Sequence, residues 1–325
     1  MSCPIGTDVE RAANLVVHAG LVAFATETVY GLGANALDAH AVARIFEVKG
    51  RPRFDPLIVH VAGIDWLDRL VTSIPGNARR LIDRFWPGPL TLVLPKTPLV
   101  PDIVTAGLPS VGVRMPAHPS ALNLLAQADT PVAAPSANLF GHVSPTTAQH
   151  VADQLGSRID YILDGGPCTV GVESTVLDMT GPSAVLLRPG GLSREQIEEV
   201  VGPVKRANTS SGDENPQPSP GMLSTHYAPR TPLILLGPEG SLPNVVRLGL
   251  LSLVPESPLA PFAAVEILSP RGDLTEAAAN LFAAMRRLDN QELELIVARP
   301  VPQTGLGEAI NDRLQRAARR SLGRQ

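Results

Sequence analysis

Short apolar runs and longer segments with helical spacing alternate along residues 1–202. The apolar runs are typical of buried strands and lie at 21–25, 57–61, 91–94, 111–114, 132–134, 161–163, 175–177 and 185–187. The helical segments are expected at 9–17, 39–49, 66–71, 78–85, 120–127, 146–155 and 195–201. Because several strands follow one another without a helix between them, the pattern predicts an α/β domain with a mixed sheet.

Polar residues mark where three of these helices begin. Residues 7–10 (TDVE) have the form of a capping box that starts at Thr7, and residues 193–196 (SREQ) have the form of another. Asp38 precedes the second helix, and Lys49 stands at its C-terminal end. This predicts that Lys49 lies at the mouth of the following loop.

The composition changes after residue 202, which predicts a domain boundary. Residues 203–231 are rich in Ser, Asn, Pro and Gly and read as a linker, but 220–229 (PGMLSTHYAP) are unusually apolar and aromatic. We expect this patch to dock as a lid over a site in the first domain. The order strand, strand, strand, helix, strand, helix then predicts a small Rossmann-like α/β domain at 232–325, with 1–202 as the first domain.

Composition and charge exclude several classes of protein. Hydrophobic residues make up 44% of the chain, which is enough for a core, and the net charge of −4 argues against binding nucleic acid by bulk electrostatics. The two cysteines, Cys3 and Cys168, lack metal-ligand spacing, which is typical of a reducing compartment. We find no run of about 18 apolar residues and no leader-like start, so we expect a cytoplasmic protein without a membrane partner.

Polar chemistry is concentrated between the strands at 21–25 and 57–61. This stretch contains Thr26, Thr28, a Gly-rich turn, and the three cations Lys49, Arg51 and Arg53. Buried cations are costly without partners, so the stretch is predicted to form half of an anion site. Residues 136–138 (SAN) follow another buried strand and offer hydroxyl and amide groups for the other half. The two halves are expected to meet across a shared cavity, without a P-loop.

Other motifs have competing interpretations. Residues 31–36 (GLGANA) match a dinucleotide fingerprint, but no helix opens at these glycines, so a tight turn is favoured. Arg114 ends an apolar strand, where it would bind a carboxylate ligand or pair with a nearby Asp or Glu. From chemistry alone His60 is expected to be a core histidine, and Cys168 a structural residue. The arginines near the C-terminus, from Arg313 onward, are expected to complement the end of the last helix.

Taken together, these segments resemble the threonylcarbamoyl-AMP synthase family in its longer form, with an extra C-terminal domain. Matching stretches occur in the family's order at 26–33, 49–52, 56–60, 85–91, 113–116, 134–138, 171–175, 187–190, 219–222 and 226–229. Departures are small, since Ala25 replaces a frequent proline and Phe54 occupies a variable position. The resemblance implies a YrdC-like fold, a curved mixed α/β sheet around a large cavity.

The resemblance also implies a reaction. L-threonine, bicarbonate and ATP would give threonylcarbamoyl-adenylate and pyrophosphate, with Mg²⁺ carried by ATP and no metal ligand from the protein. Partner proteins would then transfer the threonylcarbamoyl group to the adenosine beside the anticodon of tRNAs that read codons beginning with A. Direct contact between this chain and tRNA is left open.

The family's site positions are carried over residue by residue. L-threonine would be bound by Thr28, His60, Arg114, Ala134 and Ser174. ATP would be bound by Lys49, Arg51, Asp55, Ser110, Ser136, Asn138, Ser144, Arg188 and Tyr227. No side chain would act as nucleophile, and Lys49 and Arg51 would stabilise charge on the phosphates.

Two alternatives are kept. A carbamoyl-transferring relative in hydrogenase maturation is disfavoured, because that architecture adds an acylphosphatase-like domain and cysteine-rich zinc fingers, which two cysteines do not supply. A non-enzymatic double-stranded RNA-binding protein with the same basic cavity is the other alternative. Threonine-dependent turnover of ATP would separate both from the synthase.

Overall fold

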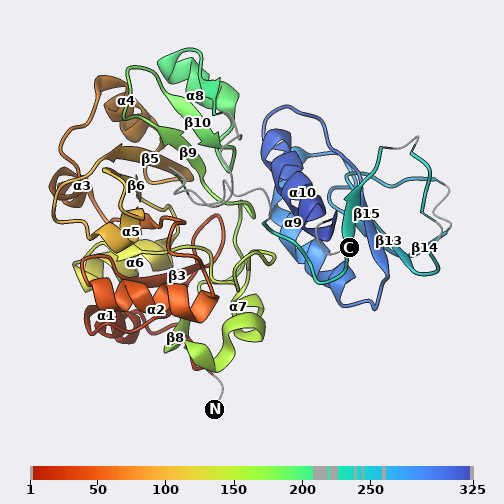
Figure 1. Ribbon diagram of the computed structural model, residues 1–325, viewed down its shortest axis with the longest axis horizontal. Coiled ribbons are helices and arrows are strands. Elements are labelled where there is room, and N and C mark those ends of the chain that lie inside the picture. Colours follow the sequence, from red (N-terminus) through yellow and green to blue (C-terminus); the bar gives the residue numbers. More distant parts are fainter. Residues whose placement is uncertain are drawn as a thin grey trace.

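The computed structural model describes residues 3–207, 219, 226–237, 240–243, 245–257 and 261–322. Figure 1 shows a larger α/β domain that contains the N-terminal half of the chain and a smaller one that contains the C-terminal residues. Among the described residues, no helix is long and apolar enough to cross a membrane.

The larger domain is built on a mixed sheet, as predicted. In the described residues its strand order is β1-β8-β2-β3-β7-β4-β6-β5-β9-β10-β11, and both parallel pairs (β4 with β6) and antiparallel pairs (β3 with β7) occur. The strands are β1 (Ile5–Gly6), β2 (Val22–Phe24), β3 (Gly31–Asn35), β4 (Ile58–His60), β5 (Leu90–Pro95), β6 (Ser110–Arg114), β7 (Val132–Ala133), β8 (Tyr161–Leu163), β9 (Thr175–Asp178), β10 (Val185–Arg188) and β11 (Lys205–Arg206).

Helices form at every segment where the apolar spacing predicts one. They are α1 (Val9–Val17), α2 (Ala39–Lys49), α3 (Ile64–Leu70), α4 (Gly76–Phe85), α6 (Pro119–Ala128), α7 (Ala148–Leu155) and α8 (Arg194–Val201), with a further short helix α5 (Asp102–Thr105). Asp38 caps α2, and the capping box at Ser193 is present. The cap predicted at Thr7 is wrong by one residue, because Asp8 accepts the backbone N–H of Arg11 and caps α1 instead.

The glycines at 31 and 33 form strand β3, so the tight turn predicted there is wrong. A Cβ atom at Gly33 would lie 2.8 Å from the ring of Phe24 and 2.8 Å from Val132. These glycines therefore leave room for β2 and β7 to pack on either side of β3, and no reversal of the chain is needed.

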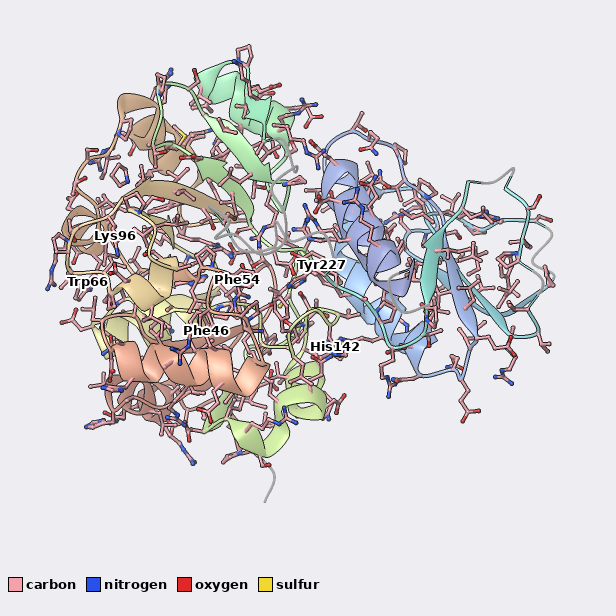
Figure 2. All side chains as sticks on the ribbon, in the orientation of Figure 1. Phe46, Phe54, Trp66, Lys96, His142 and Tyr227 are labelled. Carbon is pink, nitrogen blue, oxygen red and sulfur yellow. The ribbon has the colours of Figure 1, made fainter. Side chains whose placement is uncertain are left out.

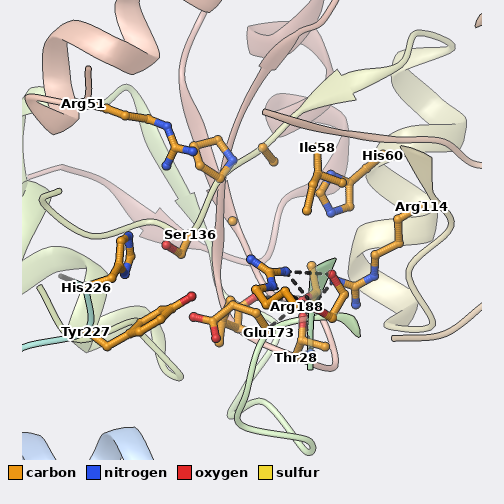
Figure 3. A pocket seen from close by; sticks show the side chains of 16 residues that line it. Thr28, Arg51, Ile58, His60, Arg114, Ser136, Glu173, Arg188, His226 and Tyr227 are labelled. Atoms are coloured by element: carbon orange, nitrogen blue, oxygen red, sulfur yellow. Dashed lines mark hydrogen bonds between the residues drawn. The ribbon is translucent and has the colours of Figure 1, made fainter. Parts of the chain in front are cut away.

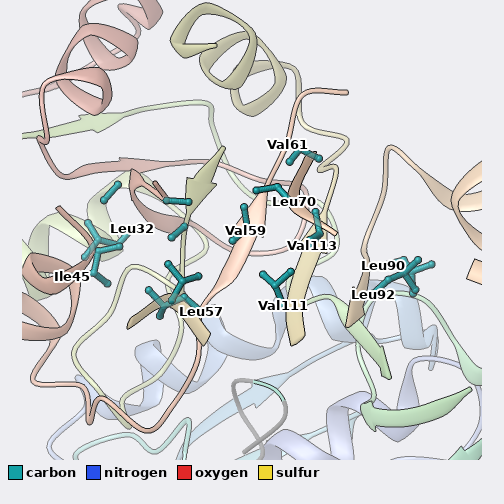
Figure 4. Packing of buried hydrophobic residues seen from close by; sticks show 14 of the residues in the cluster. Leu32, Ile45, Leu57, Val59, Val61, Leu70, Leu90, Leu92, Val111 and Val113 are labelled. Carbon is teal, nitrogen blue, oxygen red and sulfur yellow. The ribbon is translucent and has the colours of Figure 1, made fainter. Parts of the chain in front are cut away.

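Both faces of the sheet are covered, which explains why its strands are apolar throughout. On one face Leu32, Leu57, Val59 and Val113 join a large apolar cluster with the helices α2 to α4 (Figure 4). On the other face Phe24 packs with residues of α1 and α6.

The C-terminal domain is a small α/β domain, as predicted, and its sheet is parallel. Its order is β12-β15-β13-β14, formed by β12 (Leu233–Leu235), β13 (Leu248–Ser252), β14 (Phe262–Ile267) and β15 (Leu295–Ala298). The helices α9 (Leu274–Asp289) and α10 (Gly307–Leu322) lie between this sheet and the larger domain (Figure 1). The face that this domain turns toward the larger domain is therefore helical.

The expected role of the C-terminal arginines is wrong for two of them. Arg313 and Arg316 are buried within α10, where both pair with Asp312. Their charges are neutralised by carboxylates rather than by the C-terminal end of the helix.

Candidate functional site

One buried cavity collects polar groups from several strand ends and from the segment that joins the domains. Its volume is about 50 Å³, whereas pockets for drug-sized ligands usually span about 300–1,000 Å³. The volume of this cavity is thus smaller than that of the large cavity that the resemblance implies. Figure 3 shows the residues that line it, which are Thr26, Thr28, Val29, Gly31, Arg51, Ile58, His60, Arg114, Ala134, Pro135, Ser136, Glu173, Ser174, Arg188, His226 and Tyr227.

All five residues proposed for threonine lie on this cavity. Arg114, at the end of β6, donates from Nη1 to the hydroxyl of Thr28 (2.9 Å) and from Nε to the carbonyl of Gly88 (3.1 Å). The hydroxyl of Ser174 is held by Thr91 at 2.8 Å. These contacts fix the cation and the two hydroxyl groups before any ligand arrives.

His60 faces the cavity from β4, so it is more than a core histidine. Burial, followed by the charge of Arg114, lowers the pKa of His60 from 6.5 to about 3. Its Nδ1 atom has no hydrogen-bond partner among the described residues. The imidazole is therefore neutral near pH 7, and a ring nitrogen is available to a polar ligand.

The cations near residue 50 and the groups near residue 137 meet at this cavity, as predicted. Lys49 donates from Nζ to the carbonyls of Ser136 and Asn138, each at 2.5 Å. Arg51 lines the cavity and forms a buried ion pair with Asp55 (2.9 Å). Burial lowers the pKa of Lys49, so contacts with carbonyl oxygens are needed to keep its charge.

The remaining positions proposed for ATP lie around the cavity at different depths. Arg188 lines it and donates from Nη2 to the carbonyl (2.9 Å) and hydroxyl (3.1 Å) of Ser174. Asn138 and Ser144 are buried beside it, and Ser144 donates to Glu173. Ser110 lies on a neighbouring small cavity, which shares Ile58 with the first.

The segment 226–230 covers one side of the cavity. The ring of Tyr227 stacks on Phe282 of α9 at 5.8 Å, and Ala228 forms a parallel β-bridge with His142. Figure 2 shows Tyr227 at the junction of the two domains. The φ of Tyr227 is 65°, a left-handed conformation that costs about 1–2 kcal/mol for a residue other than glycine. Residues 220–225 of the expected lid lie outside the described residues.

Sequence reasoning missed three groups at this site. Glu27 lies 2.7 Å from Arg114, and Glu173 and His226 line the cavity. They lie inside the matching stretches 26–33, 171–175 and 226–229, but the side chains that they contact come from distant parts of the chain. Glu27 and Glu173 pair with arginines that are distant in the sequence. The sequence around each acid shows only a charge beside an apolar strand, so it does not predict the pair.

The fold and the cavity define a YrdC-like α/β protein with a polar, cation-lined ligand site. A family model described as "Telomere recombination", for Sua5, YciO and YrdC, matches residues 14–190. A second model, described as "Threonylcarbamoyl-AMP synthase, C-terminal domain", matches residues 192–319. The chain belongs to the threonylcarbamoyl-AMP synthase family, which confirms the resemblance seen in the sequence.

Relatives match almost the whole chain. The threonylcarbamoyl-AMP synthase of Pyrococcus abyssi is 45% identical over 94% of this chain and 93% of its own. That of Bacillus subtilis is 46% identical over 95% of this chain and 92% of its own. Because these full-length relatives are synthases, neither the hydrogenase-maturation alternative nor the RNA-binding alternative is favoured.

Solved structures agree in both domains. The structure of P. abyssi Sua5 complexed with L-threonine has a TM-score of 0.88 at 43% identity, covering 95% of this chain and 94% of that one. A P. abyssi variant in which a histidine and the following tyrosine are replaced by alanine gives a TM-score of 0.88 at 40% identity, covering 97% of this chain and 96% of that one. Full-length HypF, at 20% identity, a TM-score of 0.51 and coverage of 57% of this chain and 29% of that one, shares the fold alone.

Proposed function

We propose that the cavity makes threonylcarbamoyl-adenylate from L-threonine, bicarbonate and ATP, with release of pyrophosphate. One observation carries this proposal. Groups suited to an amino acid (Thr28, Arg114) and groups suited to phosphates (Arg51, Arg188) line the same buried cavity.

The threonine half of the site lies around Arg114. Its guanidinium suits a carboxylate, because planar N–H groups can bind both oxygens. Thr28 and Ser174 offer hydroxyl groups nearby, and neutral His60 offers a ring nitrogen to the amine or hydroxyl of the substrate. Ala134 sets the width of this part of the cavity.

The nucleotide half of the site lies around Arg51, Ser136 and Arg188. Lys49 and the backbone N–H of Asn138 both donate to the carbonyl of Ser136, and Asp55 orients Arg51. The cations would neutralise charge that develops on the α-phosphate and on the leaving pyrophosphate. Ser110, Ser144 and Tyr227 complete the proposed ATP set.

The reaction requires two bond-forming steps. The amine of threonine attacks CO₂ with loss of one proton, or bicarbonate with cleavage of a C–O bond and loss of water, which forms an N–C bond and gives a carbamate. A carbamate oxygen then attacks the α-phosphorus of ATP, and the bond to the β-phosphate oxygen breaks to release pyrophosphate. Holding this short-lived carbamate in line is the main task of the protein, and such positioning can lower a barrier by about 7–11 kcal/mol. No nucleophilic side chain is required.

Magnesium fits this site as a companion of ATP. Mg²⁺ prefers oxygen ligands and usually keeps waters and substrate phosphates in its shell. The amide oxygen of Asn138 is buried and has no hydrogen-bond partner among the described residues, and the hydroxyl of Ser136 lines the cavity. Bound with ATP, the metal would neutralise phosphate charge.

We further propose that residues 203–231 link a catalytic domain (1–202) to a C-terminal domain (232–325) and carry a lid. His226 and Tyr227 line one side of the cavity, so this segment is placed to open when ATP enters and to close over it. Tyr227→Ala should impair turnover while the catalytic domain keeps its fold, as circular dichroism of the variant would show. Unaltered turnover would argue against the lid.

The product would pass to proteins that transfer the threonylcarbamoyl group to tRNA, and this chain would contact tRNA directly only through a local surface. The primary test is pyrophosphate release by the purified protein. Release should require L-threonine and bicarbonate together, and omission of either should abolish it. Release that is indifferent to threonine would overturn the proposed function.

A further inference from the structure

The two domains share one apolar cluster around the cavity. Val29, Val143 and Val172 of the larger domain pack with Tyr227 and with α9 residues such as Phe282. Gly171 lies against α9 so closely that a Cβ atom there would be 2.4 Å from the backbone of Ala278 and Ala279. The loop that carries Glu173 is therefore held directly against the C-terminal domain.

Arg313 extends this contact into the catalytic domain. It lies on α10 with an exposed fraction of 0%, and its Nε atom is 2.7 Å from a carboxylate oxygen of Glu173. Its Nη1 atom donates to the carbonyl of Pro189 (3.0 Å) and to Asp312 (2.8 Å). The guanidinium thus crosses the interface and contacts two loops of the catalytic domain.

Glu173 needs this partner because it lines the proposed ATP site. Burial raises the pKa of Glu173, whereas the charges of Arg313 and Arg188 lower it. The lowering is the stronger effect, so the pKa of Glu173 lies below its ordinary value. The carboxylate is therefore ionised, and it lines a cavity that is proposed to bind phosphates. Without a compensating cation, it would repel them.

Arg313 also holds the ring that covers the cavity. Its Cζ atom lies 5.0 Å from the ring centroid of Tyr227, within the range of a cation–π contact. Phe282 stacks on the same ring. In Figure 3 Tyr227 and Glu173 lie side by side at one edge of the cavity. One residue of the C-terminal domain therefore contacts both.

We propose that Arg313 is a positioning residue of the nucleotide site, through which the C-terminal domain neutralises Glu173 and fixes Tyr227 so that ATP can bind. This proposal rests on the proposed function, because it takes ATP as the ligand. It assigns to the C-terminal domain a direct part in nucleotide affinity.

The simplest rival is that Arg313 only ties the domains together. A matched control separates the two roles. Arg299 is also a buried arginine of the C-terminal domain, paired with Glu256 at 3.1 Å and bonded to the carbonyl of Gly237. Arg299→Gln removes an arginine–glutamate ion pair of the same domain, although a more exposed one, without touching Glu173 or Tyr227.

The experiment measures Mg-ATP affinity of the full chain by calorimetry, and KM for ATP and for threonine in the pyrophosphate assay. Arg313→Gln should weaken ATP affinity on the order of tenfold to a hundredfold and raise KM for ATP more than KM for threonine. Arg313→Lys, which keeps the charge, should retain part of the affinity. Arg299→Gln should lower the melting temperature and leave ATP affinity within about twofold of wild type.

A second substitution tests the electrostatic cause. Adding Glu173→Gln to Arg313→Gln removes the carboxylate charge that has lost its ion-pair partner and should restore most of the ATP affinity. No restoration, an equal loss in Arg299→Gln, or unchanged affinity in Arg313→Gln would each overturn the proposal. If Arg313→Gln does not fold, Arg313→Lys with and without Glu173→Gln gives the same comparison. Because calorimetry needs no turnover, a wild type that binds ATP without threonine-dependent release would overturn the proposed function alone.

Discussion

The carboxylate of Glu27 lies 2.7 Å from the guanidinium of Arg114, and the side chains of both residues are less than 10% exposed. Arg114 lines the cavity where the carboxylate of threonine is proposed to bind, and Glu27 does not, so the ion pair lies beside that position. Glu27 therefore orients Arg114, and the substrate carboxylate would share the same cation.

Replacement of Glu27 tests this arrangement. Glu27→Gln leaves Arg114 without its buried counterion, and removing one partner of such a pair costs about 3–5 kcal/mol of unfolding free energy. Because threonine brings a carboxylate to Arg114, saturating threonine should raise the melting temperature of Glu27→Gln more than that of wild type. Thermal denaturation with and without threonine measures this, and equal shifts would contradict the proposed threonine position.

The three cations near residue 50 should differ sharply in importance. Arg51 lines the cavity, whereas Arg53 is exposed. Arg51→Gln should reduce kcat/KM for ATP by more than about a hundredfold, since charge on the phosphates loses a buried partner. Arg53→Gln is the matched control and should stay within about threefold of wild type. Similar losses in both variants would show that net charge, rather than the cavity, governs ATP use.

Gly171 should be required for contact between the domains. Its φ is +77° and its Cα faces the backbone of α9, so alanine would add both backbone strain and a clash. Gly107 has a φ of +79° with open space around it, so Gly107→Ala carries the strain alone, about 1–2 kcal/mol.

Urea denaturation and limited proteolysis of the two variants isolate the clash. Gly171→Ala should lose clearly more unfolding free energy than Gly107→Ala and should be cut between the domains more rapidly. Equal losses would mean that α9 shifts freely to accommodate the added methyl group.

The pH dependence of stability should report on His60. Its pKa is lowered to about 3 in the folded protein and lies near 6.5 when unfolded. Between these values the unfolded chain binds the extra proton, so the unfolding free energy falls as pH falls, by up to about 1.4 kcal/mol per pH unit. His60→Gln should flatten the curve between about pH 4 and 6.5. Burial also lowers the pKa of His150 and His226, but these remain in both proteins. Parallel curves would mean that His60 is protonated in the native state.

Local patterns in the sequence predicted most of the elements, because buried strands appear as short apolar runs and amphipathic helices show apolar residues at helical spacing. The strands that the sequence did not predict were β1 and β11, of two residues each, and β3, whose glycines interrupt the apolar run. Glycine at 33 is selected by the bulk of Phe24 on the neighbouring strand. Such a reason exists only in three dimensions.

The candidate site was predictable in part for the same reason. Lys49, Arg51 and Ser136 stand beside buried strands, where polar groups are conspicuous. Glu173 and Arg313 are 140 residues apart in the sequence, and neither gives a local signal of the other. The residues that neutralise and orient the proposed ligand-binding groups were therefore found only from the fold.

The strand order has a consequence for how the protein matures during synthesis. β7 lies between β3 and β4 in the sheet, although it follows both in the chain, so the cavity closes only after distant segments have left the ribosome. Arg313 is added later still, from the last helix. In a nascent chain that ends before α10, Glu173 would lack its ion-pair partner Arg313 at the proposed ligand site. Such truncated chains would therefore bind ATP poorly.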